Sequence, residues 1–329
     1  MYTRRAIQIS IGLVLLVALL IGVQSVLPQA GTPSVEVIKY SFSVAAGDPL
    51  AAIVKPADIL SLSGMIQIPC EQLGLLCADP VSGAFDDLGG LSFGSDFLGS
   101  ESMVIHFSVG RGSQGSAGSA VRVEASCSTA EPHEDVFAST LLGANQQALD
   151  GNGTACSTNS GSGLFIQEGM VSDNLDALER DPCLWVDLDC DHAPEGMVFF
   201  SLKSGSPSLA YYAATPADIL VTASGYAPQI WASGSSDLGL VSNDQIDALC
   251  IRDDGDGAYS PADQVLFSLA PGSPTLIATG YSAADLLRPK RRPGVTAAQM
   301  GLLTSDNLDA AVCIGEFKFY DLYLPLIKK

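Results

Sequence analysis

Positive charge and histidine are scarce in this sequence. The 329 residues include 16 lysines and arginines against 36 aspartates and glutamates, which gives a formal net charge of −20 at pH 7, and only three histidines. Nucleic acids and anionic membranes bind positively charged surfaces, so this balance disfavours both as partners and suits cations instead. The histidines (His106, His133 and His192) follow no catalytic-triad arrangement, and no cysteine or histidine spacing typical of zinc sites occurs.

The sequence also contains only one long apolar run. It extends from Ile7 to Val23, follows Arg4 and Arg5, and leads into small and polar residues. This is the layout of a secretory signal. We therefore expect residues 1–25 to be a signal peptide, with an uncleaved N-terminal anchor as the alternative, and residues 26–34 to be a linker. The protein would then be secreted or held at the cell surface, and would meet the membrane only through this segment.

Eight cysteines in an exported chain indicate disulfide bonds rather than free thiols. Short separations favour the pairs Cys70–Cys77, Cys127–Cys156 and Cys183–Cys190. Cys250 and Cys313 would then pair at long range, although they sit one residue out of step relative to equivalent aspartates, so this bridge stays open.

Helical periodicity over a dozen residues is absent, and an internal repeat is present in its place. The segment FFSLKSGSPSLAYYAATPADIL (199–220) lies over LFSLAPGSPTLIATGYSAADLL (266–287) without a gap. Two earlier segments, which begin after Ser41 and after Ile105, resemble these two copies and carry Phe-Ser-Val at the corresponding place. Each copy predicts a strand ending in Phe-Ser-Leu or Phe-Ser-Val, a tight Gly-x-Pro turn with a return strand, and a short strand of the Asp-Ile-Leu type. A further strand containing Leu-Asp-Ala or Ile-Asp-Ala leads into the next copy.

These copies predict an all-β domain at residues 35–318, with units at about 35–102, 103–190, 191–254 and 255–318, and a C-terminal tail at 319–329. Four units of about four strands fit a four-bladed β-propeller. The Leu308-Asp309-Ala310 strand has no unit after it, so it can complete the first unit and close the ring. The uneven unit lengths keep two packed β-sandwich domains as the alternative.

Acidic turns between units are the candidate metal sites. When residues 252–263 are compared with a twelve-residue calcium loop, Asp254, Asp256 and Asp263 fall on ligand places three, five and twelve, although Arg252 takes the first place. The corresponding turn one unit earlier carries Asp187, Asp189 and Asp191. We expect Ca²⁺ at these six aspartates, or solvated hairpin turns, for which Asp-Gly is a natural choice.

The repeated aspartate of the Leu-Asp-Ala strands (Asp176, Asp247 and Asp309) has two interpretations. In a ring it could line a central channel and gather a cation. We favour the alternative, in which its carboxylate caps backbone N–H groups at a turn.

Two strings resemble catalytic motifs without the context that those motifs need. Gly90 to Gly94 matches a nucleophile elbow around Ser92, but it falls where the other copies have the Leu-Asp-Ala strand. Gly110 to Gly115 matches a dinucleotide-binding pattern, but we expect a loop there, followed by a strand at Val121 to Val123.

Together, the Phe-Ser-Leu, Gly-Ser-Pro, Ala-Asp-Ile-Leu and Asp-Asn-Leu-Asp-Ala-Leu elements of residues 35–314 resemble those of uncharacterised secreted repeat proteins of bacteria. The Asp247-Ala248 and Asp309-Ala310 strands are more distantly similar to hemopexin-type four-bladed propellers, whose axis can hold calcium. We expect a secreted or surface-tethered, non-catalytic scaffold that binds an extracellular protein or glycan. The alternative is an extracellular, glycan-directed hydrolase that uses acids such as Asp187 or Asp254. Acids converging in a deep pocket favour an enzyme, whereas acids at rim turns or around a metal favour a scaffold.

Overall fold

The structure is a computed structural model that describes residues 35–43, 54–61, 65–77, 85–93, 104–127, 131–151, 163–167, 173–186, 195–223, 226–253 and 257–315. Val35 to Phe317 form one compact unit. Within the described ranges, no helix has the length and hydropathy needed to cross a membrane.

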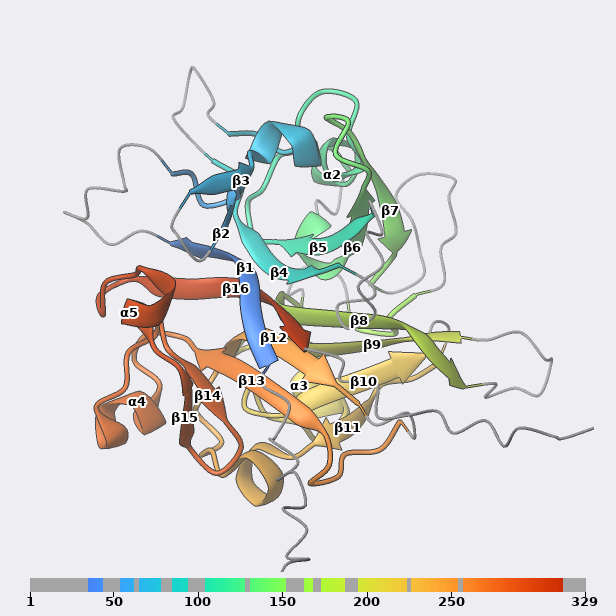
Figure 1. Ribbon diagram of the computed structural model, residues 1–329. Coiled ribbons are helices and arrows are strands. Elements are labelled where there is room, and N and C mark those ends of the chain that lie inside the picture. The colour runs from blue at the N-terminus through green and yellow to red at the C-terminus, as the bar shows by residue number, and fades with distance from the viewer. Residues whose placement is uncertain are drawn as a thin grey trace, which may run out of the picture. The chain divides into compact units, whose positions relative to one another are not determined.

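Strands dominate this unit, which confirms the all-β prediction (Figure 1). They form four antiparallel sheets of four strands, whose order follows the chain in three cases. Sheet II contains β4 (Leu88–Ser92), β5 (Ile105–Val109), β6 (Val136–Ser139) and β7 (Asn145–Leu149). Sheet III contains β8 (Leu175–Val186), β9 (Glu195–Leu202), β10 (Ile219–Ala223) and β11 (Gln229–Ala232). Sheet IV contains β12 (Ile246–Arg252), β13 (Gln264–Leu269), β14 (Leu286–Arg288) and β15 (Arg292–Val295).

Sheet I joins the two ends of the described chain. Its order is β16 (Asn307–Gly315), β1 (Val35–Ser43), β2 (Ile59–Ser61) and β3 (Ile66–Ile68). The last strand, β16, pairs antiparallel with the first, β1, from Val35 opposite Gly315 to Ser43 opposite Asn307. The expected completion of the first unit by the C-terminal Leu-Asp-Ala strand is therefore confirmed.

The first strands of the four sheets contact one another in a cycle. β4 packs against β8, β8 against β12, β12 against β16, and β16 against β4. We call these four the inner strands, and Figure 1 shows them gathered at the centre of the unit. All four carry the Leu-Asp-Ala motif or its counterpart. The repeat therefore brings equivalent residues together where the inner strands pack against one another.

The hydrophobic core is divided into four clusters, each between two neighbouring sheets. The cluster between sheets III and IV includes Phe199, Trp231 and Phe267, and the one between sheets IV and I includes Leu266 and Leu308. Equivalent clusters lie between sheets I and II and between sheets II and III. Alternating side chains of a strand point to opposite faces, so each sheet supplies apolar residues to both of its neighbours.

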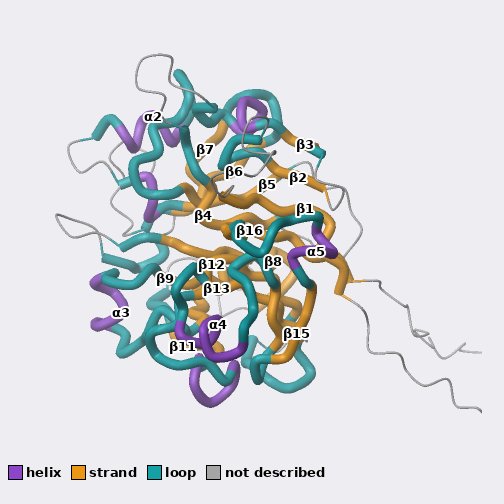
Figure 2. The backbone as a smooth tube through the Cα atoms, turned by 90° about the vertical axis from the view of Figure 1, so that its left-hand side faces the viewer, coloured by secondary structure: helices purple, strands orange, loops and turns teal. Residues whose placement is uncertain are grey.

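The Gly-Ser-Pro segments differ from the expectation of a tight turn and a return strand, because each begins a short helix. α3 (Pro207–Tyr211) and α4 (Pro274–Thr279) both start with proline, which favours the first helical position because it needs no N–H partner there. Residues Val121 to Val123 are likewise helical, in α2 (Ala120–Ala125), and Ser119 caps that helix by accepting a hydrogen bond from the Arg122 N–H. Figure 2 shows these helices outside the strands.

The aspartate of the Ala-Asp-Ile and Ala-Asp-Leu segments ties two pieces of backbone together. Asp218 accepts hydrogen bonds from the backbone N–H groups of Thr215 (2.7 Å) and Gly234 (2.6 Å), and Gly234 is the first residue of η4 (Gly234–Leu238). Asp58 and Asp285 do the same for η2 (Cys70–Leu73) and α5 (Ala297–Met300). These carboxylates satisfy N–H groups that a helix start otherwise leaves unpaired.

A second aspartate precedes each inner strand and holds the next loop. Asp244 accepts hydrogen bonds from the N–H groups of Val241 and Thr275, both at 2.8 Å, and from the Thr275 hydroxyl at 2.5 Å. Asp173 binds the N–H groups of Gln167 and Ser208 in the same way. These five aspartates therefore anchor backbone N–H groups of loops and helix starts.

Candidate functional site

A cavity of about 620 Å³ lies where the inner strands begin. Residues from all four inner strands, and residues that follow β5, β9 and β13, line it. The charged and amide side chains among them are Asp87, Asp176, Asp247, Asp309, Lys203, Arg111, Asn174, Gln245 and Asn307. We call this space the acidic cavity and Asp87, Asp176, Asp247 and Asp309 the cavity carboxylates.

The repeat explains why acids meet here. Three inner strands begin with an amide residue, an apolar residue and an aspartate, as in Asn174-Leu175-Asp176. The fourth reads Asp87-Leu88-Gly89, so its acid lies two residues earlier. A Cβ atom at Gly89 would come within 2.7 Å of the Leu175 carbonyl oxygen, which leaves no room for a side chain. The carboxylate is therefore displaced along the strand, and this inner strand still contributes one acid to the cavity.

Lys203 is the cation of this site, and its position departs from the repeat. The equivalent residues Gly110 and Ala270 also line the cavity but carry no charge. The Lys203 Nζ atom lies 3.4 Å from Asp176 Oδ1, and half of its side chain is exposed. Asp176, together with Asp247 and Asp309, raises the pKa of Lys203, because each carboxylate favours the ammonium form. The only sequence signal for Lys203 was this charge at a place where the other copies are small.

Burial makes ionisation of the cavity carboxylates costly. It raises the pKa of Asp247, which is 4% exposed, to about 6. Burial, and then the nearby charge of Asp247, raises the pKa of Asp87 to about 7. The same two causes raise the pKa of Asp176, whose carboxyl lies within hydrogen-bonding reach of that of Asp247. Removing a carboxylate from water and placing another beside it both favour the protonated form.

Several oxygen atoms in the cavity have no donor. Oδ2 of Asp176 and of Asp247 accept no hydrogen bond from any described N–H or hydroxyl group, and the same holds for Oδ1 of Asn174, which is 6% exposed. Unsatisfied Asp87 Oδ1 and Asn307 Oδ1 belong to the same cavity. Buried acceptors are costly unless they are paired. The cavity thus offers more acceptors than its own donors fill.

Asp176, Asp247 and Asp309 all line this cavity, in agreement with the first interpretation of the repeated aspartate. That they gather a cation stays a prediction. The favoured capping interpretation is wrong for Asp176, whose hydrogen-bond donor is the Lys203 ammonium. The carboxylates that cap backbone lie three residues earlier, at Asp173, Asp244 and their counterparts, because only these stand at the loop before the strand.

Of the six predicted calcium residues the structure describes only Asp263, which is not among the residues that line this cavity. Asp263 is half-buried, and its carboxylate accepts a hydrogen bond from the Ser260 N–H at the turn before β13. Asp254, Asp256, Asp187, Asp189 and Asp191 fall outside the described residues. Calcium binding at these two turns stays a prediction.

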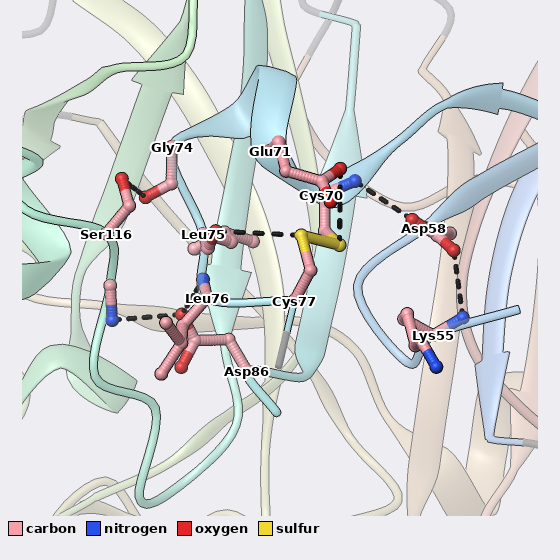
Figure 3. The surroundings of a disulfide bond; sticks show 11 residues. Lys55, Asp58, Cys70, Glu71, Gly74, Leu75, Leu76, Cys77, Asp86 and Ser116 are labelled. Atoms are coloured by element: carbon pink, nitrogen blue, oxygen red, sulfur yellow. Dashed lines mark hydrogen bonds between the residues drawn. A yellow bond between two sulfur atoms is a disulfide. The ribbon is translucent and has the colours of Figure 1, made fainter. Parts of the chain in front are cut away.

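One group of potential metal ligands is found among the described residues, and it is already used as a disulfide. Cys70, Glu71 and Cys77 bring their ligand atoms within 4.8 Å of one another, but Cys70 and Cys77 are bonded to each other (Figure 3). That predicted pair is confirmed. Cys127 and Cys250 are also disulfide-bonded. The structure does not describe their expected partners, since Cys156 and the side chain of Cys313 lie outside the described part of the chain. The expected Cys183–Cys190 pair lies outside it as well.

Ser92 is not arranged as a nucleophile. It ends strand β4, and its hydroxyl donates a 2.7 Å hydrogen bond to Glu179 Oε1. His106 Nε2 instead lies 2.5 Å from the Arg180 guanidinium, and burial together with that charge lowers the pKa of His106 to about 3. A histidine held neutral against arginine is poorly placed to serve as a base for Ser92.

Comparison of the chain with protein-family models, with curated proteins and with solved structures finds no match. The resemblance to secreted bacterial repeat proteins therefore stays a prediction. The functional conclusion rests on the acidic cavity itself.

Proposed function

We propose that this protein is an exported, non-catalytic binding scaffold, built as a four-bladed β-propeller, whose acidic cavity is its ligand site. The observation that carries the proposal is that every inner strand contributes one carboxylate to the same cavity, where buried acceptor oxygens lack donors. A cavity of about 620 Å³ falls within the size range of small-ligand sites.

Three features support the propeller over two β-sandwiches. The inner strands contact one another in a cycle, the last strand pairs with the first, and apolar clusters lie between all four neighbouring pairs of sheets. Two sandwiches would concentrate the core in two places. Radial repetition also leaves only short sheet edges open to other chains.

Export is supported by disulfide bonding. Four of the eight cysteines are disulfide-bonded among the described residues, as is typical of proteins that fold in oxidising compartments. An acid-rich exported scaffold fits an extracellular partner, either a protein or a glycan that presents positive charge or hydrogen-bond donors.

A hydrolase is the second candidate, and the convergence of acids in one cavity, which we expected of an enzyme, favours it. Asp176 and Asp247 form a close carboxyl pair with raised pKa values in a cavity, which is how acid–base catalysts are often arranged. Against this, the two acids occupy equivalent places in the repeat, and Lys203 neutralises one of them. The same carboxylate also recurs in a third copy, at Asp309, so the repeat architecture accounts for its presence without catalysis.

The test compares binding with turnover. Thermal melting of the wild-type ectodomain (residues 26–329, without the expected signal peptide) with a panel of cations (Ca²⁺, spermidine, arginine) is expected to show stabilisation by at least one of them, with Asp247→Asn losing that stabilisation. Chromogenic glycosides are expected to stay intact. Glycoside cleavage by the wild type that Asp247→Asn abolishes would establish the hydrolase instead.

A further inference from the structure

The geometry points to an alkylammonium group as the ligand of the acidic cavity, supplied by a free polyamine or by a lysine side chain of a partner, and held by the cavity carboxylates beside Lys203. This inference rests on the proposed binding function and names the chemical class of its ligand.

The first step is the shortage of donors. The cavity holds four carboxylates and three amide side chains, and its cations are Lys203 and the exposed Arg111. The oxygens without donors include the amide oxygen of Asn174, which is buried and independent of the acid cluster. A ligand that fits must therefore bring both positive charge and several N–H donors.

The second step separates an organic cation from a metal ion. A bound Ca²⁺ holds its oxygen ligands at about 2.3–2.6 Å, so they lie within about 5 Å of one another. No three of the cavity carboxylates bring their oxygens within 4.8 Å of one another; among the described side chains only the Cys70–Glu71–Cys77 group does so. The acids surround a space far larger than one ion. They are spread in the way that a multi-donor organic cation requires.

Lys203 already places one ammonium group in the acidic cavity. The Lys203 ammonium already lies at this wall, 3.4 Å from Asp176 and close enough to Asp247 and Asp309 for each to raise its pKa. One ammonium leaves Oδ2 of Asp176, Oδ2 of Asp247 and Oδ1 of Asp87 without donors. A second ammonium can therefore bind without displacing the first.

The experiment is isothermal titration calorimetry of the disulfide-intact ectodomain at pH 8. Spermidine, a blocked tetralysine peptide, Ca²⁺ and tetramethylammonium are titrated separately. Spermidine, the peptide or both are expected to bind, and the tighter of the two identifies the source of the ammonium. Tetramethylammonium has the charge without N–H donors and is expected to bind at least about tenfold more weakly, because the cavity selects by hydrogen bonding as well as charge.

Two variants and a control locate the binding. Asp247→Asn is expected to weaken spermidine at least about tenfold. Lys203→Met is expected to strengthen it several-fold, because the positive charge of Lys203 no longer repels the bound ammonium and Asp176 Oδ1 is left to accept from the ligand; a variant that merely misfolds cannot produce this gain. Glu71→Gln removes an exposed carboxylate outside the cavity and is expected to leave the affinity within about twofold.

The pH dependence adds a further readout. Spermidine affinity is expected to fall from pH 8 to pH 5, because Asp247 and Asp87, whose pKa values are raised to about 6 and about 7, take up protons across this range. The other charged side chains that line the cavity are Asp176, Asp309, Lys203 and Arg111. Binding of Ca²⁺ without spermidine or peptide would overturn the ammonium inference and leave the binding function standing. No binding by any of the four probes would overturn both.

Discussion

Asp244 provides the sharpest test of how this fold uses its acids. Its side chain is fully buried and accepts three hydrogen bonds, from the N–H groups of Val241 and Thr275 and from the Thr275 hydroxyl. Hydrogen bonds to a charged group contribute about 1.5–3 kcal/mol each, and unpaired buried donors add to the loss. Asp244→Ala is therefore expected to lower the free energy of unfolding by at least about 4 kcal/mol.

The measurement is urea unfolding of the oxidised protein, followed by tryptophan fluorescence. Trp231 is a suitable reporter because it is buried and packs edge-on against Phe199 at 5.0 Å between ring centroids. A melting midpoint at least about 8 °C lower is expected in parallel. The exposed Glu71→Ala serves as the control and is expected to change stability by less than about 0.5 kcal/mol.

Asp244→Asn separates the hydrogen bonds from the volume of the side chain. The amide retains one acceptor oxygen but turns an NH₂ group toward donors. The free energy of unfolding of Asp244→Asn is therefore expected to lie between those of the wild type and the alanine variant. If Asp244→Ala unfolds within about 1 kcal/mol of the wild type, the assignment of these acids as backbone anchors is wrong.

Four further outcomes are expected. Replacing Cys70 and Cys77 by serine is expected to cost about 2–3 kcal/mol in urea unfolding, because the bond closes a short loop with a separation of seven residues; no change would argue against a stabilising role. Gly89→Ala is expected to cost more than about 2 kcal/mol, since a Cβ there lies 2.7 Å from a carbonyl oxygen of β8; a wild-type melting point would contradict that close approach. Asp247 binds its proton more tightly in the folded state, so its stabilisation is complete below pH 3.8 and is lost as the pH rises to about 6. The free energy of unfolding of Asp247→Asn is therefore expected to fall by up to about 3 kcal/mol less than that of the wild type over this range, because other buried acids such as Asp87 titrate in both proteins. Added calcium is expected to raise the melting midpoint of EDTA-treated protein if the acidic turn before β13 binds it; an unchanged midpoint removes that prediction.

Much of the fold could be predicted from the repeat. The period placed the Phe-Ser-Leu, Asp-Ile-Leu and Leu-Asp-Ala strands, although not the expected return strands, and the unpaired Leu308-Asp309-Ala310 strand predicted the pairing of β16 with β1. The short helices were missed because one helical turn is too brief to show a period of 3.6 residues. At α3, only the proline at its first position could have indicated a helix.

The candidate site was partly predictable. The recurrence of Asp176, Asp247 and Asp309 indicated a shared location, but not which of several aspartates in each unit would face it. That choice depends on strand register, since a shift of one residue turns a side chain to the other face. Asp87 and Lys203 were missed because both depart from the repeat. The displaced position of Asp87 is explained by the close approach of β8 to Gly89, which the structure shows and the sequence does not.

The most direct test of cation binding in the acidic cavity is carboxyl ¹³C NMR of the aspartates, titrated with pH in the presence and absence of spermidine. Asn substitutions at individual positions assign the signals. The account predicts that Asp247 and Asp87 titrate at about pH 6 and about pH 7 in the free protein, and that both midpoints fall when spermidine is added, because a bound cation favours the ionised forms. Midpoints near pH 4 in the free protein, or midpoints that spermidine leaves in place, would contradict a shared cation-binding cavity.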